Sequence, residues 1–189
     1  PMVRASDGRG SGGVTIDRRA FLGGAAMLLL WPGRGLAQAQ ASAATPLPQE
    51  TLGLLDTSKF VYVSPLRKDG AESTCHGEVW YAWLDGSVVL NTRRGTWKVK
   101  SLENGLDRAR IWVGDHGRWK PALGSGRSEA FRKAPSFDAR ASFETDRKVL
   151  DRLIALYEKK YEGEFERWRE DMQAGFFSGQ RKLIRYTPV

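Results

Sequence analysis

The chain has 189 residues, of which 41% are hydrophobic, 28% charged and 11% aromatic, and its formal net charge is +8. These proportions are typical of a folded domain and exclude collagen-like, low-complexity and polytopic membrane proteins. The charge is divided: residues 1–41 hold five Lys/Arg against two Asp/Glu, and residues 42–189 hold 25 against 20. The body is only mildly basic and its cations are interleaved with acids, so we expect no nucleic-acid partner.

Residues 1–41 have the order of an export leader. A charged stretch precedes the apolar run Ala20–Trp31, and small residues follow it. This order, with the small-x-small sequence at Ala37–Ala41, predicts a signal peptide that is cleaved near Gln40 or Ser42. The apolar run has 12 residues, whereas a spanning helix needs about 20. We therefore expect no stable membrane anchor.

Two paired arginines in this leader resemble the twin-arginine export signal. Arg18-Arg19 stands directly before Ala20-Phe21-Leu22, although Asp17 and Gly23 differ from the residues usual in that signal. An ordinary secretory leader that contains two arginines is the alternative. The resemblance implies export to the periplasm through the twin-arginine machinery, a route used mainly by proteins that fold and bind a cofactor first. Cys75 is the single cysteine, so the fold must form without an intrachain disulfide.

The sequence predicts a linker and a short helical turn over residues 42–58, and the folded domain over residues 59–189. Its first part holds three strand-like runs, residues 60–66, 73–84 and 87–92, with turn residues between them. The second turn, Asp85-Gly86, is a strong hairpin signal. Sequential hairpins of this kind favour an antiparallel barrel or sandwich.

The rest of the domain mixes helices and strands. Residues 96–104 predict a short helix that Thr96 caps, and residues 146–161 predict an amphipathic helix with Lys160 on its surface. A further helix is expected over residues 164–174, after a break at Gly163. The remaining strand candidates are residues 109–113, 118–123, 137–143 and 182–186. The expected fold class is mainly β, of the α+β kind.

The segment Thr92–Lys100 is the first candidate site. It offers hydroxyls, four cationic side chains and a glycine at the start of the predicted helix. Free backbone N–H groups and the positive end of a helix attract anions, and Lys or Arg side chains complete the charge match to a phosphate. A solvated basic loop followed by a capped helix is the alternative interpretation.

The order of these elements resembles the FMN-binding split barrel of the pyridoxamine-phosphate-oxidase-like family. The resemblance runs from about Phe60 to Asp115. The motifs that carry it are Val63–Leu66, Asp69-Gly70, Val79–Tyr81, Asp85-Gly86, Leu90–Thr92, Trp97-Lys98, Leu102 and Ala109–Val113. It implies a six-stranded split barrel with flanking helices, a homodimer with the flavin at the subunit interface, and an FMN-dependent oxidoreductase that acts on an unidentified small molecule.

The resemblance also implies which residues hold the cofactor. In that family a Thr or Ser at the end of the third strand and a Lys at the start of the next helix hold the flavin phosphate, which corresponds to Thr92 and Lys98. The second strand lies beside the isoalloxazine ring. The expected cofactor-binding residues are Val79, Trp80, Thr92, Arg93, Arg94, Trp97 and Lys98, with Arg93 and Arg94 as additional phosphate contacts.

Two departures from the family limit what can be carried over. Cys75–Glu78 stands where the family usually has a small residue or a proline, and residues 180–186 lack the Trp/Arg-rich segment that recognises substrate in true pyridoxine-phosphate oxidases. Vitamin B6 oxidation is therefore not expected. The same barrel can hold a deazaflavin or haem, or act as a binding protein without catalysis, and these alternatives stay open.

His76 and Cys75 have two interpretations each. Strand alternation puts Thr74, His76, Glu78 and Trp80 on one face, where His76 could transfer protons or bind a metal or haem. Because the chain has no second ligand at metal spacing, we favour a hydrogen-bonded polar residue and expect no metal site. Cys75 is expected to be a small buried strand residue rather than a nucleophile.

Overall fold

The computed structural model of the chain describes residues 46–119 and 128–189. The predicted export leader and most of the predicted strand 118–123 lie outside these residues. In chain order the elements are α1 (Gln49–Thr57), β1 (Val61–Pro65), β2 (Glu78–Val79), β3 (Ala82–Leu84), β4 (Ser87–Arg93), α2 (Trp97–Glu103), β5 (Arg108–Val113), the 3-10 helix η1 (Ala130–Lys133), β6 (Ser136–Glu144), α3 (Arg147–Lys160), α4 (Glu166–Phe177) and β7 (Arg181–Pro188).

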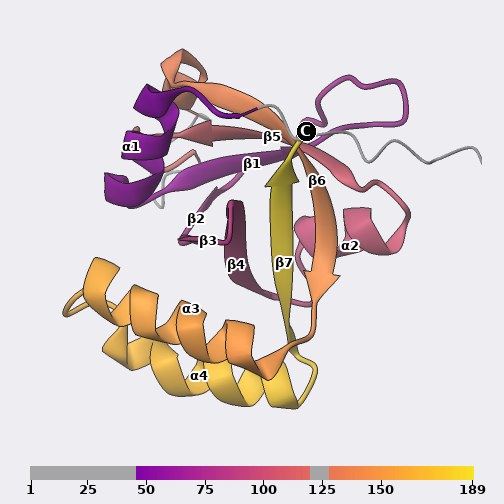
Figure 1. Cartoon of the computed structure of the whole chain (residues 1–189). Coiled ribbons are helices and arrows are strands. Elements are labelled where there is room, and N and C mark those ends of the chain that lie inside the picture. The colour runs from indigo at the N-terminus through magenta and orange to yellow at the C-terminus, as the bar shows by residue number, and fades with distance from the viewer. Residues whose placement is uncertain (1–45, 120–127) are drawn as a thin grey trace, which may run out of the picture. The chain divides into compact units, whose positions relative to one another are not determined.

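The strands form one antiparallel sheet in the order β2-β1-β5-β6-β7-β4-β3. Its two edge strands, β2 and β3, are separated in the chain by Trp80 and Tyr81 alone. The chain itself thus joins the two edges, and the sheet curves into a barrel with α3 and α4 side by side along one flank (Figure 1). The predicted α+β antiparallel split barrel with flanking helices is confirmed. The sheet has seven strands instead of six because the predicted strand 73–84 is divided into β2 and β3.

Two tyrosines, Tyr157 in α3 and Tyr161 directly after it, explain why that strand is interrupted. The Tyr157 hydroxyl donates to the carbonyl of Trp80 at 2.7 Å, and the Tyr81 N–H donates to the Tyr161 hydroxyl at 2.9 Å. Tyr161 in turn donates to the carbonyl of Lys59 at 2.8 Å. These side chains satisfy buried backbone groups that would otherwise need a neighbouring strand.

Removing the Tyr161 hydroxyl is expected to destabilise the fold. Tyr161→Phe leaves the N–H of the buried Tyr81 without its acceptor, and we expect the free energy of unfolding to fall by about 1–3 kcal/mol. Tyr186→Phe is the matched control, because the Tyr186 side chain is also buried but its hydroxyl makes no hydrogen bond among the residues that the structure describes. Urea unfolding measures both. Equal losses in the two variants would contradict the role given to Tyr161.

The barrel interior is filled by the alternate residues of five strands. Val61, Ile111 and Ile184 are among its fully buried side chains, and Leu55 of α1 and Val99 of α2 pack against them. On the outer surface, α3 and α4 cover β3, β4 and β7. A smaller cluster lies on the outer face of the barrel. It consists of Tyr62 of β1, Trp112 of β5 and Phe131 of η1. Thus α1 and α2 contribute to the interior cluster, whereas α3 and α4 pack on the outer surface.

Several local predictions are confirmed. Asp85 and Gly86 both have positive φ values, 51° and 70°, as a two-residue hairpin turn requires. The helix predicted over residues 146–161 is α3, and Asp146 caps it by accepting from the N–H of Lys148 at 2.8 Å, a cap that was not predicted. Gly163 has a φ of 74° and separates α3 from α4, as expected.

Other local predictions are wrong. Thr96 occupies the N-cap position of α2 but its side chain makes no capping hydrogen bond; its hydroxyl lies 3.2 Å from that of Thr92 instead. Cys75 is exposed and lies outside the strands, since β2 begins only at Glu78. Arg118 and Trp119 are not in a strand. The helix η1 was not expected in the Gly/Ser-rich stretch that precedes β6.

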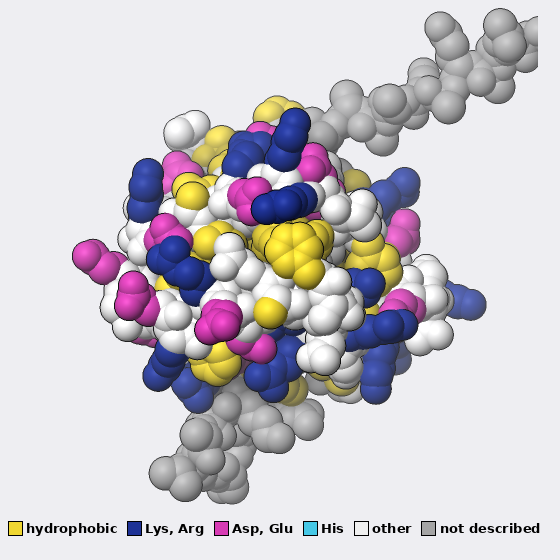
Figure 2. All heavy atoms as spheres, turned by 90° about the horizontal axis from the view of Figure 1, so that it is seen from below, with side chains coloured by type: hydrophobic (Ala, Val, Ile, Leu, Met, Phe, Trp, Pro, Cys, Tyr) yellow, Lys and Arg dark blue, Asp and Glu magenta, His cyan; other side chains and the backbone are white. Residues whose placement is uncertain are grey.

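The face made by α3 and α4 carries charges of both signs, intermixed over its area (Figure 2). Many of them are paired: Arg152 with Asp85 at 2.8 Å, Arg147 with Asp151 at 3.8 Å, and Arg169 with Glu158. This is the pattern of a solvated surface. Among residues 46–119 and 128–189, no helix combines the length and the hydropathy that a membrane span requires.

Candidate functional site

Lys98 is a buried cation at the start of α2. Lys98 is only 8% exposed, and its ammonium lies 4.7 Å from the centroid of the Trp97 ring. Within the described ranges it makes no ion pair or hydrogen bond. Burial lowers the pKa of Lys98 to about 8, although the carboxylate of Glu78 acts in the opposite direction. A buried ammonium without an oxygen partner is costly, and an anion would compensate it.

The surroundings of Lys98 suit a phosphate group. Thr92, at the end of β4, is buried, and its hydroxyl and that of Thr96 lie 3.2 Å apart. Both hydroxyls can donate to phosphate oxygens. At Gly77 a Cβ atom would lie 3.5 Å from the Trp97 ring and 3.9 Å from the Lys98 ammonium, so the backbone leading into β2 passes close to α2. The structure therefore places Lys98 close to the segment that enters β2, and Thr92 in contact with Thr96 at the start of α2.

Arg93 and Arg94 are placed differently. Both are exposed; Arg93 lies 4.0 Å from Asp171 of α4, and Arg94 lies 3.7 Å from Glu103 of α2. Because side chains alternate along a strand, Arg93 and Thr92 of β4 point to opposite faces. The structure does not bring these two arginines to Lys98, and their expected phosphate contacts stay predictions.

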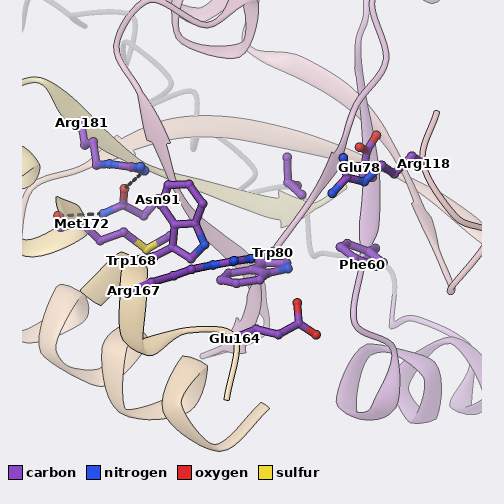
Figure 3. A pocket seen from close by; sticks show the side chains of 11 residues that line it. Phe60, Glu78, Trp80, Asn91, Arg118, Glu164, Arg167, Trp168, Met172 and Arg181 are labelled. Atoms are coloured by element: carbon purple, nitrogen blue, oxygen red, sulfur yellow. Dashed lines mark hydrogen bonds between the residues drawn. The ribbon is translucent and has the colours of Figure 1, made fainter. Parts of the chain in front are cut away.

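A pocket of about 340 Å³ opens beside β2 and β4 (Figure 3). Val79 and Trp80, the residues expected beside a flavin ring, both line it, whereas Thr92, Trp97 and Lys98 do not. Its lining consists of Phe60, Glu78, Val79, Trp80, Asn91, Arg118, Glu164, Arg167, Trp168, Met172 and Arg181. Glu78 connects the two features, because it lines the pocket and its charge also acts on Lys98.

Hydrogen bonds and stacking hold much of the pocket wall in place. Trp80 stacks on Tyr161 with ring centroids 4.4 Å apart and 12° between planes. The buried Arg181 donates to Asp171 at 2.7 Å and to the side-chain oxygen of Asn91 at 3.1 Å. Asn91 in turn donates to the carbonyl of Met172 at 3.4 Å. These contacts fix α4 against β4 and β7.

The sequence analysis missed most of this lining. It predicted α4, but no pattern in the sequence places α4 opposite β4, and the pocket lies between them. One signal was present: Asn91 is a polar amide that directly follows the apolar run Val88–Leu90. An amide in a buried strand needs hydrogen-bond partners, and here Arg181 and Met172 supply them.

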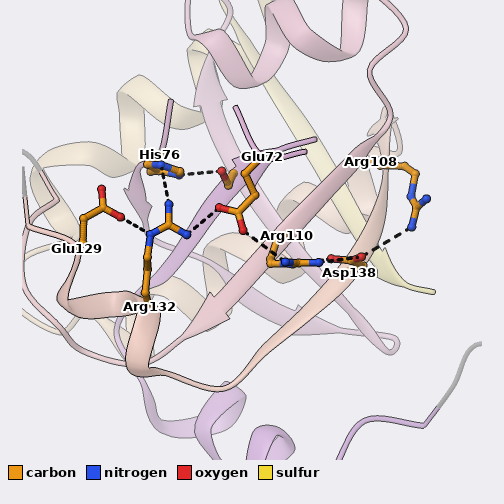
Figure 4. A network of polar contacts seen from close by, with 8 residues as sticks. Glu72, His76, Arg108, Arg110, Glu129, Arg132 and Asp138 are labelled. Carbon is orange, nitrogen blue, oxygen red and sulfur yellow. Dashed lines mark hydrogen bonds and ion pairs between the residues drawn. The ribbon is translucent and has the colours of Figure 1, made fainter. Parts of the chain in front are cut away.

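His76 belongs to a separate network (Figure 4). Its Nδ1 lies 2.7 Å from the Ser64 hydroxyl, and its Nε2 lies 3.2 Å from a nitrogen of Arg132. A guanidinium can only donate, so Nε2 is the acceptor, and Nδ1 carries the proton and donates to Ser64. His76 is thus neutral, buried and outside the lining of the pocket. This agrees with the interpretation favoured from sequence, a hydrogen-bonded polar residue.

The network continues across the outer face of the barrel. Arg132 pairs with Glu72 at 2.9 Å and also with Glu129; Glu72 contacts Arg110 at 3.4 Å, and Arg110 binds Asp138 at 2.9 Å. It ties the segment before β2 to η1, β5 and β6. In the part of the chain that the structure describes, no cluster of three His, Cys, Asp or Glu side chains could hold a metal ion.

Comparison with known proteins finds no matching family model and no matching curated protein. Similar solved structures include the haem storage protein HutZ from Vibrio cholerae, with 16% identity over 77% of this chain and 92% of that chain and a TM-score of 0.48. An FAD-binding protein from Mesorhizobium loti shows 16% identity over 76% and 91%, with a TM-score of 0.47.

A putative pyridoxamine 5'-phosphate oxidase from Listeria innocua is also similar, with 12% identity over 74% of this chain and 90% of that chain and a TM-score of 0.47. All three TM-scores are below 0.5. The fold assignment therefore rests on the strand order and register described above, and the site on its own geometry.

Proposed function

We propose that this protein binds FMN and is an exported flavin-dependent oxidoreductase. The observation that supports the proposal most directly is the Lys98 ammonium, buried at the start of α2 without an ion pair in the described ranges, while the hydroxyls of Thr92 and Thr96 contact each other where β4 leads into the same helix. Thr92 and Lys98 would hold the FMN phosphate, and the β2 segment with Val79 and Trp80 would lie beside the ring. FMN, when bound, supplies two-electron hydride transfer with a small-molecule substrate.

The protein residues would bind and shield the cofactor. Burial keeps Lys98 away from water. Its attraction for a phosphate is stronger in this environment than in water. Trp80, held by its stacking on Tyr161, offers a fixed aromatic edge to a flat ring. The family resemblance that suggests FMN also suggests a homodimer with the flavin at its interface, and the leader suggests a periplasmic location reached by the twin-arginine route.

Haem is a weaker alternative at this site. The one buried histidine in the described ranges, His76, accepts from Arg132 through Nε2 and contacts Ser64 through Nδ1. An axial ligand would have to give up one of these contacts. A deazaflavin also carries a phosphate that Lys98 could pair with, and it differs from FMN in its absorption.

The absorption spectrum of the protein purified from the periplasm of an expressing host tests this proposal. We expect flavin bands near those of free FMN, or their appearance when the colourless protein is titrated with FMN. Sedimentation of the loaded protein is expected to give a dimer. A Soret band, a deazaflavin band, or a colourless protein that takes up no FMN would each overturn the FMN assignment.

A further inference from the structure

The pocket beside β2 and β4 has an uneven balance of charge. It is lined by three arginines and two glutamates. Arg181 is neutralised by Asp171 at 2.7 Å, and the pocket acids are also engaged: Glu164 with Lys59 at 3.6 Å and Glu78 with the N–H of Trp119 at 3.1 Å. Since the Trp119 N–H is neutral, Glu78 keeps its charge, and Arg118 and Arg167 against Glu78 leave the lining with a net positive charge.

Arg118 and Arg167 have no ion pair or hydrogen bond among residues 46–119 and 128–189. They lie on opposite sides of the pocket (Figure 3). Arg118 directly precedes Trp119, whose N–H binds Glu78, whereas Arg167 lies over the ring of Trp168 with its guanidinium carbon 5.6 Å from the ring centroid. An anion in the pocket would meet a guanidinium group at either side.

The remaining lining favours a flat ligand. Phe60, Trp80 and Trp168 contribute aromatic rings, and Trp80 is held in one orientation by Tyr161. Aromatic walls with a few placed polar groups are typical of sites for conjugated molecules. The volume, about 340 Å³, is at the small end of the range of roughly 300–1,000 Å³ for ligand pockets, which suits one or two fused rings.

We propose that this pocket binds the substrate, and that the substrate is a small planar aromatic carboxylate whose negative charge is attracted by both Arg118 and Arg167 and pairs directly with one of them. The inference rests on the proposed flavin-dependent function, since it gives the substrate class for that reaction. A guanidinium group matches a carboxylate in shape and charge, and the aromatic walls contact the rings. The pocket would thus discriminate against neutral and cationic analogues of the same rings.

Binding of 2-naphthoate to the full chain tests the proposal, with 2-naphthalenemethanol as the neutral probe of the same rings. Quenching of tryptophan fluorescence measures the binding of both compounds. We expect naphthoate to bind about tenfold more tightly than the alcohol. Arg118→Gln and Arg167→Gln are each expected to reduce this preference several-fold, and the double variant to abolish it. Arg140→Gln is the control, because Arg140 lies on β6 and pairs with Asp107.

The outcomes separate this proposal from the FMN proposal. Equal binding of the two probes to the wild type, or the same loss with Arg140→Gln, would overturn the assignment of a carboxylate. FMN titration of the same variants gives an independent readout, and we expect Arg118→Gln and Arg167→Gln to retain FMN. If FMN displaces naphthoate, the pocket holds the flavin and not the substrate. If FMN fails to bind while naphthoate binds selectively, the carboxylate site stands and the flavin function fails.

Discussion

Lys98→Met is expected to weaken FMN binding strongly and, at the same time, to stabilise the cofactor-free protein. The ammonium is buried without an oxygen partner in the described ranges, and its pKa falls from 10.5 to about 8. A shift of this size corresponds to about 3 kcal/mol of unfavourable free energy at neutral pH, which methionine of similar length removes. The same substitution removes the charge that would bind phosphate, and we expect FMN affinity to fall about 10- to 100-fold.

Lys100→Met is the matched control, since Lys100 is on the same helix but exposed. It should leave both FMN affinity and stability nearly unchanged. Flavin fluorescence titration and urea unfolding of the cofactor-free protein measure the two effects. A variant at Lys98 that loses stability, or that binds FMN as well as Lys100→Met does, would remove the phosphate assignment.

The pH dependence of stability provides a second readout of Lys98. Since its pKa is lowered in the folded state, the unfolded chain binds more protons between about pH 8 and 10, and stability rises with pH in that window. Lys160, whose pKa burial also lowers to about 8, contributes in the same direction. Comparing the wild type with Lys98→Met isolates the contribution of Lys98. The free energy of unfolding of the variant should rise less between about pH 8 and 10 than that of the wild type.

Gly175→Ala is expected to destabilise the protein, against the usual preference of helices for alanine. A Cβ at this position in α4 would lie 2.8 Å from both Cγ and Cδ of Arg181. Arg181 cannot move away cheaply, because its guanidinium is buried and bound to Asp171 and Asn91. Overpacking of this kind costs about 1–3 kcal/mol, which exceeds the roughly 1 kcal/mol gained from helix propensity.

Gly53→Ala provides the opposite case. Gly53 is also inside a helix, α1, but a Cβ there would meet nothing within 4 Å. We expect this variant to gain about 0.5–1 kcal/mol in the free energy of unfolding. The contrast between the two glycines, measured by the same urea unfolding, tests whether α4 is fixed by Arg181. Stabilisation by both substitutions would contradict it.

Local signals predicted much of the fold. The Asp85-Gly86 turn and the Gly163 break each depend on a few neighbouring residues, and the structure has both. The interruption between β2 and β3 could not be predicted in this way. Its backbone groups are satisfied by Tyr157 and Tyr161, which are 77 and 80 residues further along the chain.

The candidate site was predictable only in part, for the same reason. The Thr92 and Lys98 pair came from the family resemblance, and the structure places both in buried positions. The opposite pocket wall comes from α4, which only tertiary packing brings to β4. Lys160 illustrates the limit of periodicity: expected on the helix surface, it places its ammonium 3.6 Å from the Tyr81 ring centroid and donates to the carbonyl of Leu55.

The position of β7 in the sheet has a consequence for the order of synthesis. β7 is hydrogen-bonded to both β4 and β6, and β4 is completed almost 90 residues before β7 begins. A nascent chain can form the β3–β4 hairpin early, but β4, and later β6, each keep an unpaired edge until the ribosome has released β7. The barrel therefore closes only after β7 has been made, through contacts of long sequence separation that form slowly, and any chaperone that guards the growing chain would have these unpaired edges to protect.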